Sequence, residues 1–478
     1  MALGRAGGRV GVEDVDTSSA SASAVFPDAE YLVLSSRLIP DLDGGYTIAT
    51  LARAKQMAQA GVADGRGPQL LTFDPGAAEA HAEHRRVFAE RGAVTAPERL
   101  RNLFDEARAP EGGAADWLLR AADADLAETP GIEYRMLADD AGRPFAALPV
   151  ITGDPDWHLT AEPVRVYDAA GVAIGGVRGF GGIYRAWLDH VTASLGERPI
   201  VVICESRQIG ELIAAWSNPR VRIIHTVHTM HVEPPYTPDA PLNALWSRWF
   251  ALAEQFDAVV WPTPTQRADV VRRFGGDATH HVVPHGVRSP RRRVAEREPG
   301  LVVVLGRLAA GKRIEHAIRA FLRADVKHTR LEIWGDGPER ARLLQLIEQL
   351  DVGDRVRLAG FAEDPALVLD RASVLLTATA FEAQGLSIVE ALAHGSPAVS
   401  YDVRYGPGDI LGAGGGVLVP DGDEEALSAA VRGLLSDPAL WEQAHQQTGA
   451  AAAAWSPEAA MDALARVARA VLEAPARR

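Results

Sequence analysis

The sequence predicts an α/β protein with two doubly wound parallel sheets and a small antiparallel β insertion in the first of them. Short apolar runs alternate with longer helical stretches from about residue 28 to 287, and the alternation starts again from 300 to 440. A stretch without apolar periodicity separates the two series. With 478 residues, of which 47% are apolar, the chain is long enough for two or three domains with sizeable cores.

The first series predicts the strands of an N-terminal domain, 28–287. Its apolar runs lie at 31–35, 70–73, 199–204, 221–225, 258–261 and 281–284, and residues 46–59 and 80–128 are predicted to be helical. Residues 131–180 break this rhythm. The Asp- and Gly-rich turns 139–143 and 168–171 separate short apolar runs there, which indicates two antiparallel hairpins.

The second series predicts a C-terminal domain, 300–440. Its strands are expected at 301–305, 331–334, 356–358, 373–376, 397–400 and 416–419, with helices at 312–324, 338–350, 364–370, 387–394 and 423–436. Residues 287–300 contain Pro290, Arg291–Arg293 and Pro299 and are predicted to be the linker. Residues 441–478 are predicted to be a helical tail that packs back on the first domain, and residues 1–27 a disordered extension.

Composition excludes several classes of protein. The 49 basic and 63 acidic residues give a net charge of −14, which argues against a nucleic-acid-binding protein. A single cysteine excludes an intramolecular disulfide framework and a Cys-rich zinc site. No apolar run reaches the roughly 18 residues of a membrane-spanning helix. We therefore expect a cytoplasmic protein, for which peripheral contact with a membrane stays an open alternative.

A glycine turn with two cations follows the first strand of the second domain. Gly306 and Arg307 come directly after residues 301–305, and Lys312 follows where a helix is predicted to begin. Glycine allows close approach of the backbone, and a helix N-terminus with two cations can hold a diphosphate. The alternative is a plain turn with both cations in solvent. Because the chain has no Gly-x-Gly-x-x-Gly at this turn and no Walker-type loop, nicotinamide and P-loop chemistry lose support.

Two carboxylates stand eight residues apart in the second domain. Glu382 lies in a predicted loop and could accept hydrogen bonds from sugar hydroxyls, while Glu390 lies in a predicted helix and could grip a ribose diol. Backbone N–H groups near Gly385 and Leu386 could face a phosphate. The alternative is structural, because Ser387-x-x-Glu390 also has the spacing of a capping box.

Three histidines end a strand of the first domain. His225, His228 and His231 could bind a sugar or form a metal cluster. Residues three apart after a strand do not reliably share a face, so the metal cluster is the weaker interpretation, and a buried core histidine is expected for at least one of them. Gly44 and Gly45, between the first strand and helix, could admit a phosphate or sugar near the backbone or form an ordinary tight turn.

Together these segments resemble the retaining nucleotide-sugar glycosyltransferases with two Rossmann-like domains, the GT-B fold of family 4. The matching motifs follow in order and are Gly306-Arg-Leu with Lys312, Trp334–Pro338, Gly360-Phe361 with Asp364, and Glu382-x7-Glu390. A narrower resemblance is to the poly(glycerol-phosphate) α-glucosyltransferases of wall teichoic acid and the protein-serine N-acetylglucosaminyltransferases. It rests on Tyr401–Pro407, His228–His231, Thr263–Gln266 and the insertion. The chain departs from these families at Ala383-Gln384, where they often have Gly-Phe.

The resemblance implies transfer of glucose or N-acetylglucosamine from a UDP-sugar to a hydroxyl of a polyol-phosphate polymer or a protein, without a bound metal. Arg307 and Lys312 would neutralise the diphosphate, Glu382 would hold the sugar and Glu390 the ribose. His228 or His231 would lie on the other side of the sugar, with His225 as a third candidate. The remaining donor-binding residues would be Gly44, Gly45, Gly306, Gly335, Phe361, Gly385 and Leu386.

Three other classes are weighed against this one. They are a non-catalytic glycosyltransferase-like partner subunit, a GT-B nucleotide-sugar epimerase, and a module that binds anionic polymers through a basic cluster such as Arg291–Arg293. Both the cation pair and the carboxylate pair are present in the sequence, which favours a catalytic protein. Formation of a homo-oligomer, with or without the insertion in its interface, stays open.

Overall fold

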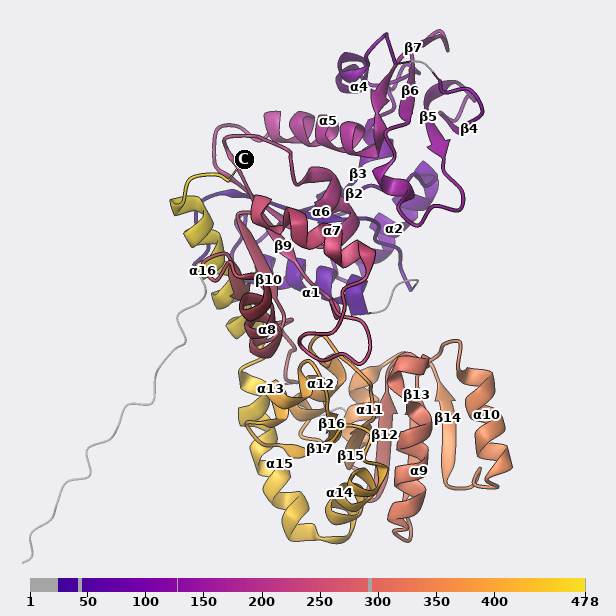
Figure 1. The fold of residues 1–478 in the computed structure, drawn as a ribbon, viewed down its shortest axis with the longest axis vertical. Helices are drawn as coiled ribbons and strands as arrows, with labels where there is room; N and C mark the ends of the chain where they lie inside the picture. Colours follow the sequence, from indigo (N-terminus) through magenta and orange to yellow (C-terminus); the bar gives the residue numbers. More distant parts are fainter. Residues whose placement is uncertain (1–24, 42–44, 127, 291–294, 478) are drawn as a thin grey trace, which may run out of the picture.

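The computed structural model describes residues 25–41, 45–126, 128–290 and 295–477. Residues 1–24 of the predicted extension, Gly44 and the basic cluster Arg291–Arg293 lie outside these ranges. Figure 1 shows two lobes, one above the other, with the antiparallel insertion at the end of the first lobe that is distant from the second.

Lobe 1 is built on a parallel sheet with the strand order β11-β10-β9-β8-β1-β2-β3 in the described residues. These strands are β1 (Glu30–Ser35), β2 (Gln69–Thr72), β3 (Leu100–Asn102), β8 (Ile200–Cys204), β9 (Val221–Thr226), β10 (Ala258–Trp261) and β11 (His280–Val282). The helices of this lobe are α1 (Gly45–Gln59), α2 (Ala78–Glu90), α3 (Leu103–Glu106), α4 (Asp116–Ala121), α5 (Gly179–Ala193), α6 (Arg207–Ile213), α7 (Ala244–Leu252) and α8 (Pro264–Phe274).

The first sheet is buried on both faces, which explains the continuous apolar runs in its strands. Successive side chains of a strand point to opposite faces. In β1, Leu32 and Leu34 enter one core, while Tyr31 and Val33 enter the core on the other face. The predicted strands of this sheet therefore form as expected, with helices packed on both sides.

The insertion is a four-stranded antiparallel sheet, as predicted. Its strands are β4 (Glu133–Ala138), β5 (Pro144–Val150), β6 (Pro163–Tyr167) and β7 (Ala173–Arg178), paired in that order. The expected turns join them: the carboxylates of Asp139 and Asp168 each accept hydrogen bonds from backbone N–H groups two and four residues further on.

The second lobe contains a parallel sheet with the order β14-β13-β12-β15-β16-β17 in the described part of the chain. Its strands are β12 (Leu301–Leu305), β13 (Arg330–Trp334), β14 (Val356–Gly360), β15 (Val374–Thr377), β16 (Ala398–Asp402) and β17 (Gly416–Pro420). Its helices are α9 (Ile314–Ala324), α10 (Arg340–Gln349), α11 (Pro365–Arg371), α12 (Leu386–Ala393), α13 (Pro407–Leu411), α14 (Glu424–Ser436) and α15 (Pro438–Ala453).

Residues 80–128 differ from the prediction of one helical region. Helix α2 ends at Glu90, and the chain then adds β3 to the edge of the first sheet, where Leu70 to Thr72 of β2 pair with it. The prediction was wrong because a three-residue strand of the sequence Leu-Arg-Asn carries no measurable alternation.

The tail is divided between the lobes. Helix α15 packs on lobe 2, where Ala451 and Ala452 join a core with residues of α12. Helix α16 (Pro457–Glu473) returns to lobe 1 and buries Met461 and Leu464 in the core beside β1. The prediction that the whole tail packs on the first lobe is therefore wrong for its first part, because the Ala-rich face of α15 already finds an apolar partner on lobe 2.

The described residues contain no helix that is both long and apolar enough to cross a membrane.

Candidate active site

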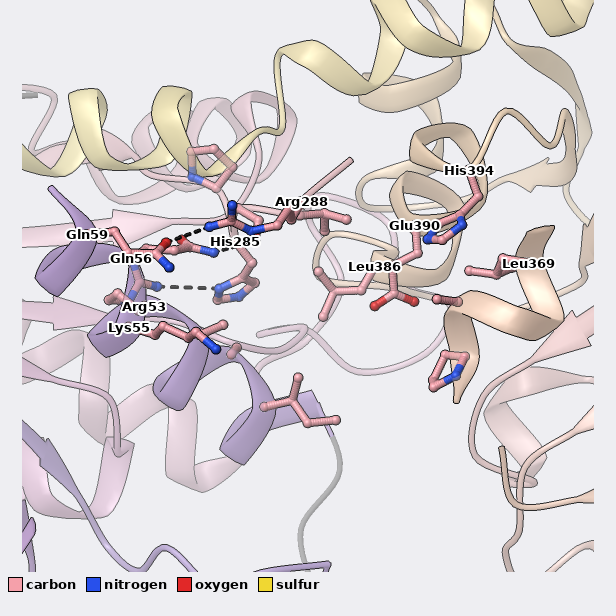
Figure 2. Close-up of a pocket in the computed structure, with 18 residues that line it drawn as sticks. Arg53, Lys55, Gln56, Gln59, His285, Arg288, Leu369, Leu386, Glu390 and His394 are labelled. Carbon is pink, nitrogen blue, oxygen red and sulfur yellow. Dashed lines mark hydrogen bonds between the residues drawn. The ribbon is translucent and has the colours of Figure 1, made fainter. Parts of the chain in front are cut away.

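A cavity of about 350 Å³ lies between the two lobes. Lobe 1 lines it with α1 and with the segment 284–288, which follows β11 and leads toward lobe 2, and lobe 2 lines it with α11 and α12. Figure 2 shows the two walls facing one another, with Arg53, Lys55 and His285 on one side and Leu386 and Glu390 on the other. Ligands of doubly wound sheets bind at such crevices.

Glu390 presents its carboxylate to this cavity. Helix α12 begins at Leu386 after Gly385, whose φ of 89° places it in the left-handed region, and no side chain caps the helix. Ser387 is therefore inside the helix, and the capping-box interpretation of Glu390 is wrong. The carboxylate has no hydrogen bond or ion pair with any described residue, and burial raises its pKa. A carboxylate left without a partner in a crevice is available to a ligand.

Lys312 and Glu382 form an ion pair, with 2.5 Å between Nζ and Oε1. Lys312 ends a short 3-10 turn after β12, and Glu382 lies in the loop between β15 and α12. The backbone N–H of Ala380 donates to the carbonyl of Gly311 at 2.8 Å and joins the two loops directly. The side chain of Lys312 is still 36% exposed, so it can also contact an anion, but neither Lys312 nor Glu382 lines the cavity between the lobes.

The glycines of lobe 2 allow two loops to approach closely. A Cβ atom on Gly335 would lie 1.9 Å from the carbonyl oxygen of Gly306, so only glycine fits there. This contact positions the turn that carries Arg307, whose side chain is exposed and makes no hydrogen bond or ion pair with another described residue. Phe361, just after β14, is 72% exposed. The structure therefore leaves both side chains accessible.

The three histidines occupy different surroundings. His225 is buried, accepts a hydrogen bond from the indole of Trp249 at 3.2 Å, and has its pKa lowered to about 3 by burial. His231 is stacked on Tyr405 within an aromatic cluster, and burial lowers its pKa to about 4. His228 keeps 11% of its side chain exposed and hydrogen-bonds Glu205 at 2.6 Å. Of the three, His228 is the one that stacks on His285, a residue of the cavity between the lobes.

The sequence analysis missed a buried network of side chains that supports His228. Glu205 follows β8, bonds Arg53 of α1 at 2.8 Å, and faces the ring of His228. Burial alone would raise the pKa of Glu205, but Arg53 and the hydrogen bond to His228 outweigh it and lower the pKa to about 2. The ring of His285 stacks on His228 at 4.9 Å. A glutamate at the carboxyl end of a fully apolar strand was the available signal for this network.

Gln384 connects the loop between β15 and α12 to the segment 284–288. Its Oε1 accepts from the backbone N–H of His285 at 2.7 Å, and its Nε2 donates to the carbonyl of the same residue at 3.0 Å. The side chain is 2% exposed. At this position the chain departs from the pattern of the families it resembles. The glutamine found there joins lobe 2 to the segment 284–288 by two hydrogen bonds.

A second cavity, of about 790 Å³, lies within lobe 1. His228, Glu205 and Tyr46 line one end of it, and residues 148–151 and 157–158 beside the insertion line the other. The second cavity therefore extends from His228 toward the insertion.

Gly45 starts α1 and is exposed, with nothing within 4 Å of a Cβ built on it. Gly44 lies outside the described residues, so the structure locates only Gly45 of the Gly44-Gly45 pair. Among the residues that the structure describes, no group of three or more His, Cys, Asp or Glu side chains is arranged to hold a metal ion.

Solved structures share this architecture over almost the whole chain. The pneumococcal O-GlcNAc transferase GtfA in complex with UDP and GlcNAc aligns with a TM-score of 0.71 at 17% identity, over 94% of this chain and all of that one. The structure of TarM aligns with a TM-score of 0.71 at 15% identity, over 93% of this chain and 99% of that one. The fold is GT-B, with two Rossmann-like lobes and a cleft between them.

Two family models match adjoining parts of the sequence. Residues 134–291 match Glycosyltransferase Family 4, and residues 288–455 match Glycosyl transferases group 1. The chain belongs to the family 4, group 1 glycosyltransferases.

Curated relatives match shorter parts. The poly(glycerol-phosphate) alpha-glucosyltransferase of Bacillus subtilis is 28% identical over 41% of this chain and 30% of its own length. The UDP-N-acetylglucosamine–peptide N-acetylglucosaminyltransferase GtfA subunit of Streptococcus gordonii is 26% identical over 52% of this chain and 51% of its own. An exopolysaccharide phosphotransferase of Streptomyces coelicolor is 38% identical over 35% of this chain and 18% of its own. The matches thus span about half or less of the length of these relatives.

Proposed function

We propose that this protein is a retaining glycosyltransferase that moves glucose or N-acetylglucosamine from a UDP-sugar to an acceptor hydroxyl. Two observations support the proposal: the unpartnered Glu390 carboxylate in the cavity between the lobes, and the Lys312–Glu382 ion pair in the loops that precede α9 and α12, outside the lining of that cavity. This set offers separate groups for a ribose, a diphosphate and a sugar.

On the donor side, departure of the diphosphate builds negative charge on its oxygens. Lys312 and Arg307 are the cations placed to stabilise that charge, and preorganised groups of this kind are worth about 3 kcal/mol each in the transition state. Glu382 holds the ammonium of Lys312 in position before the donor arrives. Glu390 would accept hydrogen bonds from the ribose hydroxyls.

On the acceptor side, His228 would face the transferred sugar from lobe 1. Its hydrogen bond to Glu205 orients the ring. We infer front-face attack by the acceptor hydroxyl, whose proton goes to the departing phosphate oxygen. Closure of the lobes would exclude water from this step.

The acceptor classes that the relatives suggest are a polyol-phosphate polymer of the teichoic acid type and a protein serine or threonine. The polymer acceptor would make this a cell-wall enzyme. A cytoplasmic location, a peripheral contact with a membrane and a homo-oligomer belong to the same proposal.

Release of UDP from UDP-glucose and UDP-N-acetylglucosamine, with and without candidate acceptors, tests the donor site. Lys312→Ala should lower kcat/KM by at least a hundredfold without unfolding the protein. Lys327→Ala, an exposed lysine on the same lobe, is the matched control and should leave turnover unchanged. Full activity of folded Lys312→Ala would contradict the proposal, and formation of an epimer of the UDP-sugar without acceptor would favour an epimerase.

A further inference from the structure

The loop that carries Glu382 is hydrogen-bonded to the segment that follows β16. The backbone N–H of Glu382 donates to the carbonyl of Arg404 at 3.1 Å, and the N–H of Tyr405 donates to the carbonyl of Glu382 at 2.9 Å. Beside these bonds, Gly406 has a φ of 91°, and a Cβ atom built on it would lie 1.9 Å from the carbonyl oxygen of Gln384. The backbone of Glu382 therefore has a fixed position relative to Tyr405.

The side chain of Tyr405 extends from lobe 2 and is buried in lobe 1. It is 1% exposed and packs in one apolar cluster with Met230, Val232 and Ala240, which lie between β9 and α7. Its ring stacks on that of His231, with 5.8 Å between the centroids and 5° between the planes. Because close packing leaves a buried ring little room to shift, these contacts fix the Tyr405 side chain relative to lobe 1.

Tyr405 thus connects lobe 1 to the ion pair of lobe 2. Its backbone bonds Glu382, whose carboxylate lies 2.5 Å from Nζ of Lys312. A displacement of about 1 Å at a group that positions a substrate can slow an enzyme about a hundredfold. A change in the packing of Tyr405 in lobe 1 is therefore expected to reach the donor site through Glu382.

We propose that Tyr405 is a positioning residue for the transferred sugar: with its ring packed in lobe 1, it holds the backbone of Glu382 where the carboxylate can bind that sugar. The inference rests on the proposed function, which assigns Glu382 to the sugar. It goes beyond that function because it makes binding of the sugar, unlike binding of the nucleotide, depend on the contact between the lobes.

Tyr405→Leu is the first variant, because it removes the ring and keeps an apolar side chain. It should weaken binding of the UDP-sugar about tenfold, the effect of one lost hydrogen bond to the sugar, and leave binding of UMP unchanged. UMP lacks the sugar and the second phosphate, so its binding should not depend on Glu382. Tyr405→Phe keeps the ring and should restore the wild-type affinity. Titration calorimetry with UDP-glucose, UDP-N-acetylglucosamine and UMP measures these affinities.

Three further variants test the connection. Met230→Ala loosens the cluster from lobe 1 and should show the same selective loss, which also provides a test if Tyr405→Leu does not fold. Phe321→Leu changes a buried aromatic residue of α9 within lobe 2 and is the matched control; it should lower Tm and leave both affinities unchanged. In a Glu382→Ala background, Tyr405→Leu should have no additional effect, since the group that it positions is already absent.

The proposal is overturned if a folded Tyr405→Leu or Met230→Ala binds the UDP-sugar as the wild type does, or if it loses affinity for UMP to the same extent. It is also overturned if the effects of Tyr405→Leu and Glu382→Ala add, which would mean that Tyr405 acts without Glu382. If Glu382→Ala itself leaves binding of the UDP-sugar unchanged, the proposed role of Glu382 fails and this inference fails with it. The two failures are therefore distinguishable.

Discussion

Glu390 illustrates how a single residue can be placed for binding at a cost in stability. Its carboxylate is largely enclosed and has no partner among the described residues, and burial raises its pKa. A carboxyl group with a raised pKa in the folded state weakens folding as pH rises above its unfolded pKa, because the charged form is penalised. Packing alone would not select such a residue, which supports the proposed role of Glu390 in binding the donor.

Glu390→Gln should raise Tm at neutral pH and raise the KM for the UDP-sugar. The amide removes the buried charge, but it cannot hold a ribose diol as an ionised carboxylate does. Thermal unfolding at pH 7 and donor titration by calorimetry measure the two effects. Glu348→Gln, on an exposed face of α10, is the control and should change neither. A fall in Tm with unchanged donor affinity would mean that Glu390 has a structural role after all.

Gln384 acts at the same scale through its two hydrogen bonds to the backbone of His285. Gln384→Ala removes both and leaves two buried backbone groups unsatisfied, so we expect a loss of about 2 kcal/mol in stability. Since Gln384 is two residues from Glu382, the donor KM should also rise. Urea unfolding and donor kinetics test this, with Gln349→Ala, at an exposed position of α10, as a control that should change neither. An unchanged donor KM in Gln384→Ala would separate this side chain from the sugar site.

At the scale of elements, His81 of α2 ties three segments together. Its ring lies between Asp74, after β2, and Asp105 of α3, at 3.0 and 2.8 Å. Burial lowers the pKa of His81, but the hydrogen bonds to Asp105 and Asp74 outweigh it and raise the pKa from 6.5 to about 9. Because Asp74 also lines the cavity of lobe 1, this array holds one wall of that cavity.

The ion pairs of His81 with Asp74 and Asp105 should make the free energy of unfolding depend on pH in the alkaline range. A raised folded-state pKa contributes stability that is fully present below pH 6.5 and is lost as the pH rises through about 9. The rise in the pKa of His81 corresponds to about 3 kcal/mol in the free energy of unfolding. Urea unfolding of the wild type and of His81→Gln between pH 6 and 10 measures it. The difference between the two proteins should shrink toward pH 10, and a constant difference would show that His81 does not titrate in this range.

For the whole molecule, direct contacts between the lobes complete the cleft. Asp409 of α13 accepts hydrogen bonds from the hydroxyl and the backbone N–H of Thr265 at 2.8 and 3.3 Å, and Phe381 of lobe 2 packs on Tyr236 of lobe 1 at 4.6 Å. Thr265 and Asp409 lie near the starts of α8 and α13, while Tyr236 and Phe381 lie in loops. Together with the stack of His231 on Tyr405 and the ion pair of Arg404 with Asp269, these contacts set the relative position of the lobes, on which closure of the cleft depends.

Asp409→Ala should loosen this closure. We expect a lower kcat with acceptor and a larger fraction of UDP released by hydrolysis, because water is excluded less well. The ratio of UDP release without and with acceptor measures the effect. Asp325→Ala, an exposed carboxylate on the far side of lobe 2, serves as the comparison. If hydrolysis stays at the wild-type fraction, these contacts do not control access of water.

Most of the fold followed from local sequence patterns. Runs such as Ile200–Cys204 and Leu301–Leu305 are buried on both sides and can only be central parallel strands, and the turns at Asp139 and Asp168 fixed the hairpins. The edge strand β3 and the division of the tail were missed, because a three-residue strand and an Ala-rich helix do not specify their neighbours.

The candidate site divides in the same way. The sequence by itself determined where the candidate donor-binding residues lie, since Gly306, Lys312, Glu382 and Glu390 follow strands whose carboxyl ends must meet at one edge of a parallel sheet. Only the tertiary structure decided that His225 and His231 are buried, that Glu390 is not a cap, and that Arg53, Glu205 and His285 support His228. The physical reason is that these contacts join residues far apart in the chain, and their partners are set by how the lobes and helices pack rather than by local periodicity.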